Sequence, residues 1–242
     1  MIINAPKRLF RKFIKKYFIP KVQFSYSQFG EDLIIAYFFN NLGINKPTYL
    51  DIGANEARYI SNTFYFYEHG SKGVLIEPNP YLAKKLKQIR RNDMVENVGI
   101  GLSQVAEADF YLFPNYANGL STFSKTEADH WQNNGMKGIG KIPIEKIIKM
   151  PLLPINSILE KYFDNTALNF ISIDVEGLDL DILKTMDFEK YTPELICVET
   201  LMYNEKQEGY KNDGILQFMA TKNYLPYADT RVNTIFARKE LL

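Results

Sequence analysis

The feature that most constrains the fold is a series of short apolar runs in which polar and apolar residues do not alternate. Such runs are typical of strands that are covered on both faces, as in a parallel sheet. Segments with helical periodicity lie between several of them, for example Tyr81–Arg91 and Leu178–Thr185. This alternation predicts an α/β, doubly wound fold with a mostly parallel sheet. The predicted strands are Tyr49–Ile52, Gly73–Ile76, Val95–Ile100, Phe170–Asp174 and Leu195–Val198.

Two regions depart from this alternation. Near the end of the chain, Tyr224–Tyr227 and Thr234–Arg238 flank a polar segment and predict an antiparallel hairpin. Between residues 115 and 153, repeated Gly and Pro predict an irregular insertion that resembles a lid, and long insertions in compact domains are often functional. We therefore predict one domain over residues 26–242, with a lid-like insertion near 115–153.

Basic residues are concentrated at the N-terminus. Seven Lys and Arg precede the first acidic residue, Glu31, and the rest of the chain is net acidic, which argues against nucleic acid as a partner. Apolar residues at helical spacing predict a basic amphipathic helix within residues 1–25. It either packs on its own domain or makes peripheral contact with a membrane or a second copy of the chain. With one cysteine and no apolar run long enough to span a bilayer, we expect a cytoplasmic protein.

The first predicted strand ends in a sharp turn that contains Asp51, Gly53 and Asn55. Ligands of doubly wound sheets bind beyond the carboxyl ends of the strands, and Gly53 permits a ligand to approach the backbone closely. The helix-compatible segment that follows is expected to present free amides to an acidic group. The second strand ends at Glu77, which can accept hydrogen bonds from two ribose hydroxyls. Only the first glycine of the dinucleotide fingerprint is present, so the pattern favours S-adenosylmethionine, whose ammonium group Asp51 could balance.

Candidate catalytic residues follow the later strands. Asp174 ends the predicted strand that begins at Phe170, Glu176 follows two positions later, and Glu199 stands at the end of the next strand. A carboxylate there could take the proton of an alcohol acceptor, and His130 in the predicted insertion is a separate candidate base. The same carboxylates could hold a divalent cation such as Mg²⁺, although direct binding of cofactor or substrate is the favoured interpretation.

Four segments together resemble the FkbM family of S-adenosylmethionine-dependent methyltransferases. The segments are YSQFGEDLII, YLDIGANEARYISNTFYFYEHG with GVLIEPNP, FISIDVEGLDLDILKTMDF and NTIFARK. The resemblance covers nearly everything after residue 25, and the order of these segments is specific. The sequence departs from the family pattern at one place: many members have a glycine where this chain has Ala57 or Arg58.

The resemblance implies a Rossmann-like class I methyltransferase with a seven-stranded, mostly parallel sheet whose last strand is antiparallel. It also implies that the helix after Gln28 folds over the cofactor pocket, whereas the residues alone equally allow a solvated helix capped by Ser27. The cofactor-binding residues expected from these motifs are Gln28, Asp51, Gly53, Asn55, Ser61, Glu77, Asn79 and Asp174.

The activity implied is O-methylation of a sugar, a nucleotide-linked sugar or a similar saccharide-pathway metabolite. The residues by themselves leave two alternative functions open. Asp174-Val-Glu176 is similar to the metal-binding sequence of glycosyltransferases, and a non-catalytic protein could retain the fold and bind the cofactor.

Overall fold

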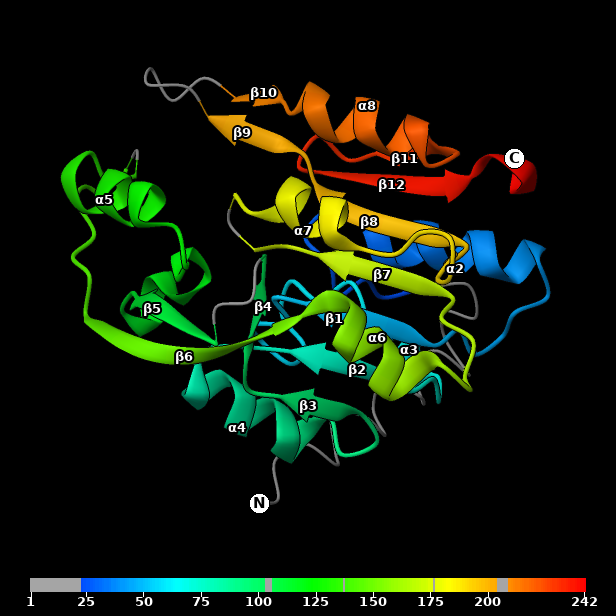
Figure 1. The fold of residues 1–242 in the computed structure, drawn as a ribbon, viewed down its shortest axis with the longest axis horizontal. Coiled ribbons are helices and arrows are strands. Elements are labelled where there is room, and N and C mark those ends of the chain that lie inside the picture. Colours follow the sequence, from blue (N-terminus) through cyan, green and yellow to red (C-terminus); the bar gives the residue numbers. More distant parts are fainter. Residues whose placement is uncertain (1–22, 103–105, 137, 176, 204–208) are drawn as a thin grey trace.

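The computed structural model describes residues 23–102, 106–136, 138–175, 177–203 and 209–242 (Figure 1). The predicted N-terminal helix lies almost entirely outside these residues. Within them, seven strands form the main sheet, and only β12 runs against the others, pairing antiparallel with both of its neighbours. The predicted mostly parallel sheet and its C-terminal hairpin are therefore confirmed. In spatial order the strands are β11 (Tyr224–Asp229), β12 (Asn233–Arg238), β8 (Leu195–Glu199), β7 (Phe170–Ile173), β1 (Tyr49–Ile52), β2 (Gly73–Ile76) and β3 (Met94–Glu96).

Helices cover both faces of the main sheet. One face packs against α2 (Glu31–Asn41), α3 (Phe64–Glu68) and α4 (Pro80–Ile89), and the other against α6 (Ile155–Phe163), α7 (Asp179–Thr185) and α8 (Asp213–Thr221).

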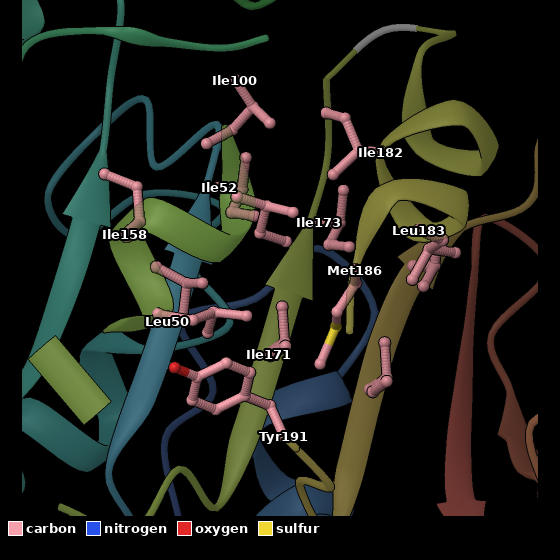
Figure 2. Packing of buried hydrophobic residues seen from close by; sticks show 14 of the residues in the cluster. Leu50, Ile52, Ile100, Ile158, Ile171, Ile173, Ile182, Leu183, Met186 and Tyr191 are labelled. Carbon is pink, nitrogen blue, oxygen red and sulfur yellow. The ribbon is translucent and has the colours of Figure 1, made fainter. Parts of the chain in front are cut away.

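Alternate residues of each central strand enter different apolar clusters. In β1, Leu50 and Ile52 join the cluster beneath α6–α8, which Figure 2 shows, whereas Tyr49 joins the one beneath α2–α4. Because both faces are buried, the strands read as uninterrupted apolar runs in the sequence.

The chain leaves the main sheet after β3, enters β4 (Gly99–Gly101) and returns at α6; we call residues 102–154, which follow β4, the excursion. It projects from the end of the sheet toward which β7 points (Figure 1). Strand β6 pairs in parallel with β4 and antiparallel with β5, forming a separate sheet. The predicted insertion at 115–153 falls within this segment, and its action as a lid stays a prediction. The elements of the excursion are β5 (Glu107–Leu112), the 3₁₀ helix η1 (Asn115–Leu120), α5 (Lys125–Asn133) and β6 (Lys146–Pro154).

Two expectations about local structure are wrong. The predicted strand Val95–Ile100 is split between β3 and β4, because the Asn97 amide donates to the carbonyls of Glu77 and Pro78 and turns the chain out of the main sheet. No helix follows the turn after β1 directly, since α3 begins only at Phe64.

The remaining elements are short. Strands β9 (Leu201–Tyr203) and β10 (Gly209–Lys211) form a two-stranded sheet, and the 3₁₀ helix η2 (Lys239–Leu241) ends the chain. None of the described helices is both long and apolar enough to cross a membrane.

Candidate active site

A cavity of about 490 Å³ opens beyond the carboxyl ends of the central strands. Each of β1, β2, β7 and β8 contributes polar groups to its lining at or just after the strand end. The topology thus brings together several of the predicted site residues, which are far apart in sequence. They are Gly53, Asn55, Glu77, Asp174 and Glu199.

The turn after β1 depends on Gly53. Its φ of 82° lies in the left-handed region, and a Cβ there would be 1.8 Å from the backbone oxygen of Asp174. The amides of Gly53 and Ala54 both donate to the carbonyl of Ile76, at 3.0 and 3.1 Å. These two amides are therefore engaged within the protein, contrary to the expectation that the amides of this turn are free to meet an acidic group of a ligand.

Glu77 is buried and holds two backbone segments together. One carboxylate oxygen accepts from the amide of Asn55 and the other from the amide of Asn79, each at 2.7 Å. Burial raises the pKa of Glu77 to about 7, and these two hydrogen bonds oppose the rise. Asn55 itself has a φ of 45°, and its Oδ1 is buried without a partner among the described residues.

Asp174 follows β7 and faces the cavity. Its side chain is exposed to the cavity, but protein surrounds it closely enough to disfavour the charged form. This desolvation, together with the carboxyls of Asp179, Asp51 and Glu31, raises the pKa of Asp174 to about 7. Asp179 is buried, and it accepts from the amides of Val175 and Gly177, each at 3.3 Å.

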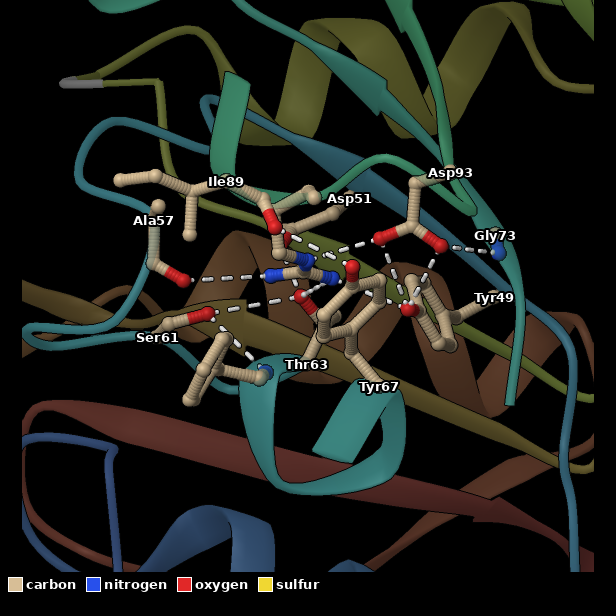
Figure 3. Close-up of polar contacts among 11 residues, drawn as sticks. Tyr49, Asp51, Ala57, Ser61, Thr63, Tyr67, Gly73, Ile89 and Asp93 are labelled. Carbon is tan, nitrogen blue, oxygen red and sulfur yellow. Dashed lines mark hydrogen bonds and ion pairs between the residues drawn. The ribbon is translucent and has the colours of Figure 1, made fainter. Parts of the chain in front are cut away.

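Asp51 is buried in β1 and is not among the residues that line the cavity. Its carboxylate accepts from Thr63 Oγ1 at 2.6 Å, and burial raises its pKa. Thr63 also accepts from Arg90, whose guanidinium pairs with Asp93 at 2.7 Å (Figure 3). In this structure Asp51 is therefore part of a buried network beneath the turn.

Arg90 joins several segments in this network. It donates to the hydroxyl of Tyr49 at 2.9 Å and to the carbonyl of Ala57 at 3.5 Å, and its side chain is 1% exposed. The network links α4 to β1 and to the turn that precedes α3 (Figure 3). Sequence reasoning missed Arg90, because no local pattern separates it from its exposed neighbour Arg91.

Ser61 and Asn79 make contacts within the protein and lie outside the cavity lining. Ser61 Oγ accepts from the amide of Phe64, at the start of α3. The Asn79 side chain caps α4, accepting from the amides of Tyr81 and Leu82.

The other predicted residues fall at different distances from the cavity. Gln28 contributes to its lining, ahead of α2. His130 lies on α5, outside the cavity lining. Its ring Nδ1 contacts the side-chain amide of Asn134, and its ring lies edge-on to that of the neighbouring Trp131. Glu176 lies outside the described residues, so its role in the site stays a prediction.

The excursion supplies an apolar wall, which sequence reasoning did not predict. Trp131 belongs to this wall, and its indole Nε1 is buried without a partner among the described residues. In the sequence, the apolar residues of this segment resemble ordinary core residues. Only the three-dimensional arrangement shows that they line the cavity. The wall includes Phe110, Tyr116, Phe123, Trp131, Ile139 and Ile142.

No group of three or more His, Cys, Asp or Glu side chains in the described part of the chain is arranged to hold a metal ion. Since Glu176 is not described, the predicted set of Asp174, Glu176 and Glu199 is not covered by this observation.

Solved structures with similar architecture are methyltransferases of low sequence identity. The 1,6-didemethyltoxoflavin-N1-methyltransferase of Burkholderia thailandensis is 11% identical, with a TM-score of 0.40 over 98% of this chain and 92% of that one. A putative O-methyltransferase from Klebsiella pneumoniae is 10% identical, with a TM-score of 0.44 over 95% of this chain and 96% of that one. Similarity at this level does not transfer a substrate. No curated protein matches the sequence.

The family model for the methyltransferase FkbM domain matches residues 51–226, which is well over half of the chain. The match spans the turn after β1, Glu77, Asp174 and Glu199, and it selects methyl transfer over the glycosyltransferase hypothesis. The chain therefore belongs to the FkbM family of methyltransferases, which use S-adenosylmethionine as methyl donor.

Proposed function

We propose that this protein is an O-methyltransferase that acts on a hydroxyl of a sugar or a similar saccharide-pathway metabolite. The observation that carries the proposal is the position of Asp174, a carboxyl with a pKa near neutrality in a cavity that also contains Glu77. A base of this pKa suits the deprotonation of an alcohol at neutral pH.

The residues around the cavity fit S-adenosylmethionine. Gly53 leaves space where a side chain would collide with Asp174, and Glu77 presents a carboxylate suited to ribose hydroxyls. Asn55 and Gln28 complete this part of the lining, and the buried Asn55 Oδ1 lacks a partner among the described residues. We assign cofactor binding to these four residues. Asp51, Ser61 and Asn79 then support the backbone of this region from beneath.

Bound S-adenosylmethionine supplies an electrophilic methyl group. That group would pass to the oxygen of the acceptor hydroxyl, and the Asp174 carboxylate would accept the hydroxyl proton. Positioning contributes much of the acceleration in a displacement of this kind. Glu199, which also lines the cavity, is a further candidate to orient or deprotonate the acceptor, and Glu176, which lies outside the described residues, stays a candidate beside Asp174; His130 lies on α5 outside the lining.

The test combines binding with turnover. Calorimetry should detect S-adenosylmethionine and S-adenosylhomocysteine but not NAD, and labelled donor should transfer its methyl group to a pool of hydroxylated sugars and polyols. Asp174→Asn should lower turnover roughly 10²-fold or more, the scale of a lost general base. The wild-type rate should rise with pH through about 7, because the Asp174 carboxylate is the active form and its pKa is about 7.

Asp181→Asn is the matched control. Asp181 is an exposed carboxylate on α7, and its one contact among those described is an ion pair with Lys184. It should leave turnover unchanged. Failure of a folded protein to bind either sulfur nucleoside would contradict the cofactor site, and full activity of Asp174→Asn would remove Asp174 from catalysis.

A further inference from the structure

Large apolar residues that are open to solvent gather around the cavity. Tyr59 and Ile60 line it from the turn that precedes α3, and Tyr116 and Ile139 line it from the excursion. These four residues, which we call the apolar mouth, are 73%, 45%, 68% and 57% exposed, in that order. Single exposed apolar residues are common on protein surfaces, but several that line one cavity indicate a surface that contacts a ligand.

Apolar side chains also line the interior of the same cavity. Phe110 and Ile142 belong to its lining and are 2% and 0% exposed. Phe110 packs against Phe123, with ring centroids 4.6 Å apart, and Ile142 lies in the apolar cluster that Trp131 joins. The excursion therefore offers apolar contacts to a ligand both at the surface and in the interior.

The backbone keeps Ile60 at the mouth. Its φ of 53° lies in the left-handed region, which β-branched residues rarely adopt. The next residue anchors the chain, because the Ser61 amide donates to the carbonyl of Tyr26 at 2.9 Å and Ser61 Oγ accepts from the Phe64 amide at 3.1 Å. Strained backbone of this kind persists only where the surrounding structure imposes it, and it is frequent at ligand sites. The turn thus holds an exposed apolar side chain at the cavity in spite of the strain.

We infer that the acceptor carries an apolar substituent, an alkyl, acyl or aryl group, beside the hydroxylated ring that is methylated, and that the apolar mouth binds this substituent. The inference rests on the proposed function and narrows it from sugars in general to sugars joined to an apolar group. With the hydroxylated ring near Asp174, the substituent removes apolar surface of both partners from water, which favours the complex in proportion to the area buried. A fully hydroxylated sugar presents little such surface.

The test compares glycosides that differ only in their substituent. Methyl, hexyl and diethylene glycol glycosides of a panel of hexoses and deoxyhexoses are offered with labelled S-adenosylmethionine. The diethylene glycol chain is as long as the hexyl chain but polar, so it controls for length. The KM of the hexyl glycosides should be lower than that of the other two by about tenfold or more, which corresponds to burial of about two methylene groups.

Binding is measured separately from turnover. Trp131 is the single tryptophan of the chain and lines the cavity, so its fluorescence reports a ligand there. In the presence of saturating S-adenosylhomocysteine, hexyl glycosides should change this fluorescence with a Kd about tenfold or more below that of the diethylene glycol glycosides.

Ile60→Asn tests the mouth without straining the fold, because Asn adopts left-handed backbone more readily than Ile. It should raise the KM of hexyl glycosides about fivefold more than that of methyl glycosides, and it should not lower the urea midpoint. Ile147→Asn is the matched control, since Ile147 is 52% exposed on β6 but lies outside the lining. Tyr116→Ala should act like Ile60→Asn on the two KM values, whereas Tyr37→Ala, on α2, should change neither.

The results distinguish failure of the inference from failure of the proposed function. Methyl transfer with equal KM values for hexyl and diethylene glycol glycosides overturns the inference and leaves O-methylation intact, as does full retention of the hexyl preference in Ile60→Asn. Preferential binding of hexyl glycosides without labelled product contradicts the proposed function and retains the mouth as an apolar binding surface. Absence of both binding and product contradicts both. A change of sedimentation in Tyr116→Ala would show that a second copy of the chain covers the mouth, which also overturns the inference.

Discussion

At the scale of single residues, Gly53 leaves less space for a side chain than any other glycine for which the structure gives contacts. The backbone there is left-handed, and the carbonyl of Asp174 occupies the space in which a side chain would have to start. The close approach of these two backbones also sets where the Asp174 carboxyl enters the cavity. One position therefore couples the turn proposed to hold the donor with the proposed base.

We expect Gly53→Ala to lose more stability than the cost of left-handed backbone alone, which is about 1–2 kcal/mol. The additional loss arises because the Asp174 backbone must move, and the displacement should weaken S-adenosylhomocysteine binding roughly tenfold or more. Gly43→Ala separates the two effects, since Gly43 has a φ of 72° but open space around it. Urea unfolding and calorimetry on both variants provide the measurement. Equal stability losses with normal binding would mean that the contact with Asp174 has no consequence.

At the scale of elements, a buried polar network joins the end of α4 to the first residues of β1 and β2 and to the turn before α3. Its Arg90–Asp93 pair is the most enclosed of the ion pairs in the described part of the chain, with side chains 1% and 0% exposed. Breaking one partner of a buried ion pair leaves the other charge uncompensated, which is why such pairs are costly to disrupt.

Arg90→Met should therefore destabilise the protein by about 3–5 kcal/mol. Arg91→Met should stay within about 0.5 kcal/mol, because Arg91 is exposed and adjacent in sequence. Denaturant titrations of both variants give the comparison. If the two variants unfold at the same denaturant concentration, the network around Arg90 does not stabilise the fold.

Element type was predictable from the sequence, and side-chain direction was not. Apolar runs bounded by helical segments predict β1, β2, β7 and β8, because two-sided burial leaves a strong local signal. That same uniformity removes the alternation that would reveal which face Asp51 occupies. The hydrogen bond of Asp51 with Thr63 was therefore not predicted, and its role in cofactor binding stays a prediction. Arg90 and the aromatic wall depend on contacts between distant segments, such as that of Arg90 with Thr63, which no local pattern encodes.

At the scale of the whole molecule, several carboxyls that the protein surrounds closely have pKa values raised toward neutrality, mainly by desolvation. The pKa is about 7 for Glu77, about 7 for Asp174 and about 6 for Asp179. In the unfolded chain these groups titrate near pH 4. Between pH 4 and 7 the folded protein thus binds more protons at these sites than the unfolded chain does.

Linkage then gives the sign of the pH dependence: these groups make stability fall as pH rises from about 4.5 to 7. We expect the urea midpoint to be higher at pH 5.5 than at pH 8, and the difference to shrink in Asp174→Asn. Carboxyls with lowered pKa values, such as Glu31 and Asp229, act in the opposite direction only at lower pH. A midpoint that rises steadily from pH 5.5 to 8 would show that the raised pKa values do not govern stability.

The pairing of β4 with β6 has an evolutionary consequence. It places Gly99–Gly101, just before the excursion, beside Leu152–Pro154 at its end, so the two ends of the excursion lie next to each other. A loop whose ends already meet can be lengthened, shortened or exchanged without changing the register of any strand in the main sheet. Recombination can therefore replace the excursion, and with it the apolar wall of the cavity, while the strands that position Gly53, Glu77 and Asp174 are retained.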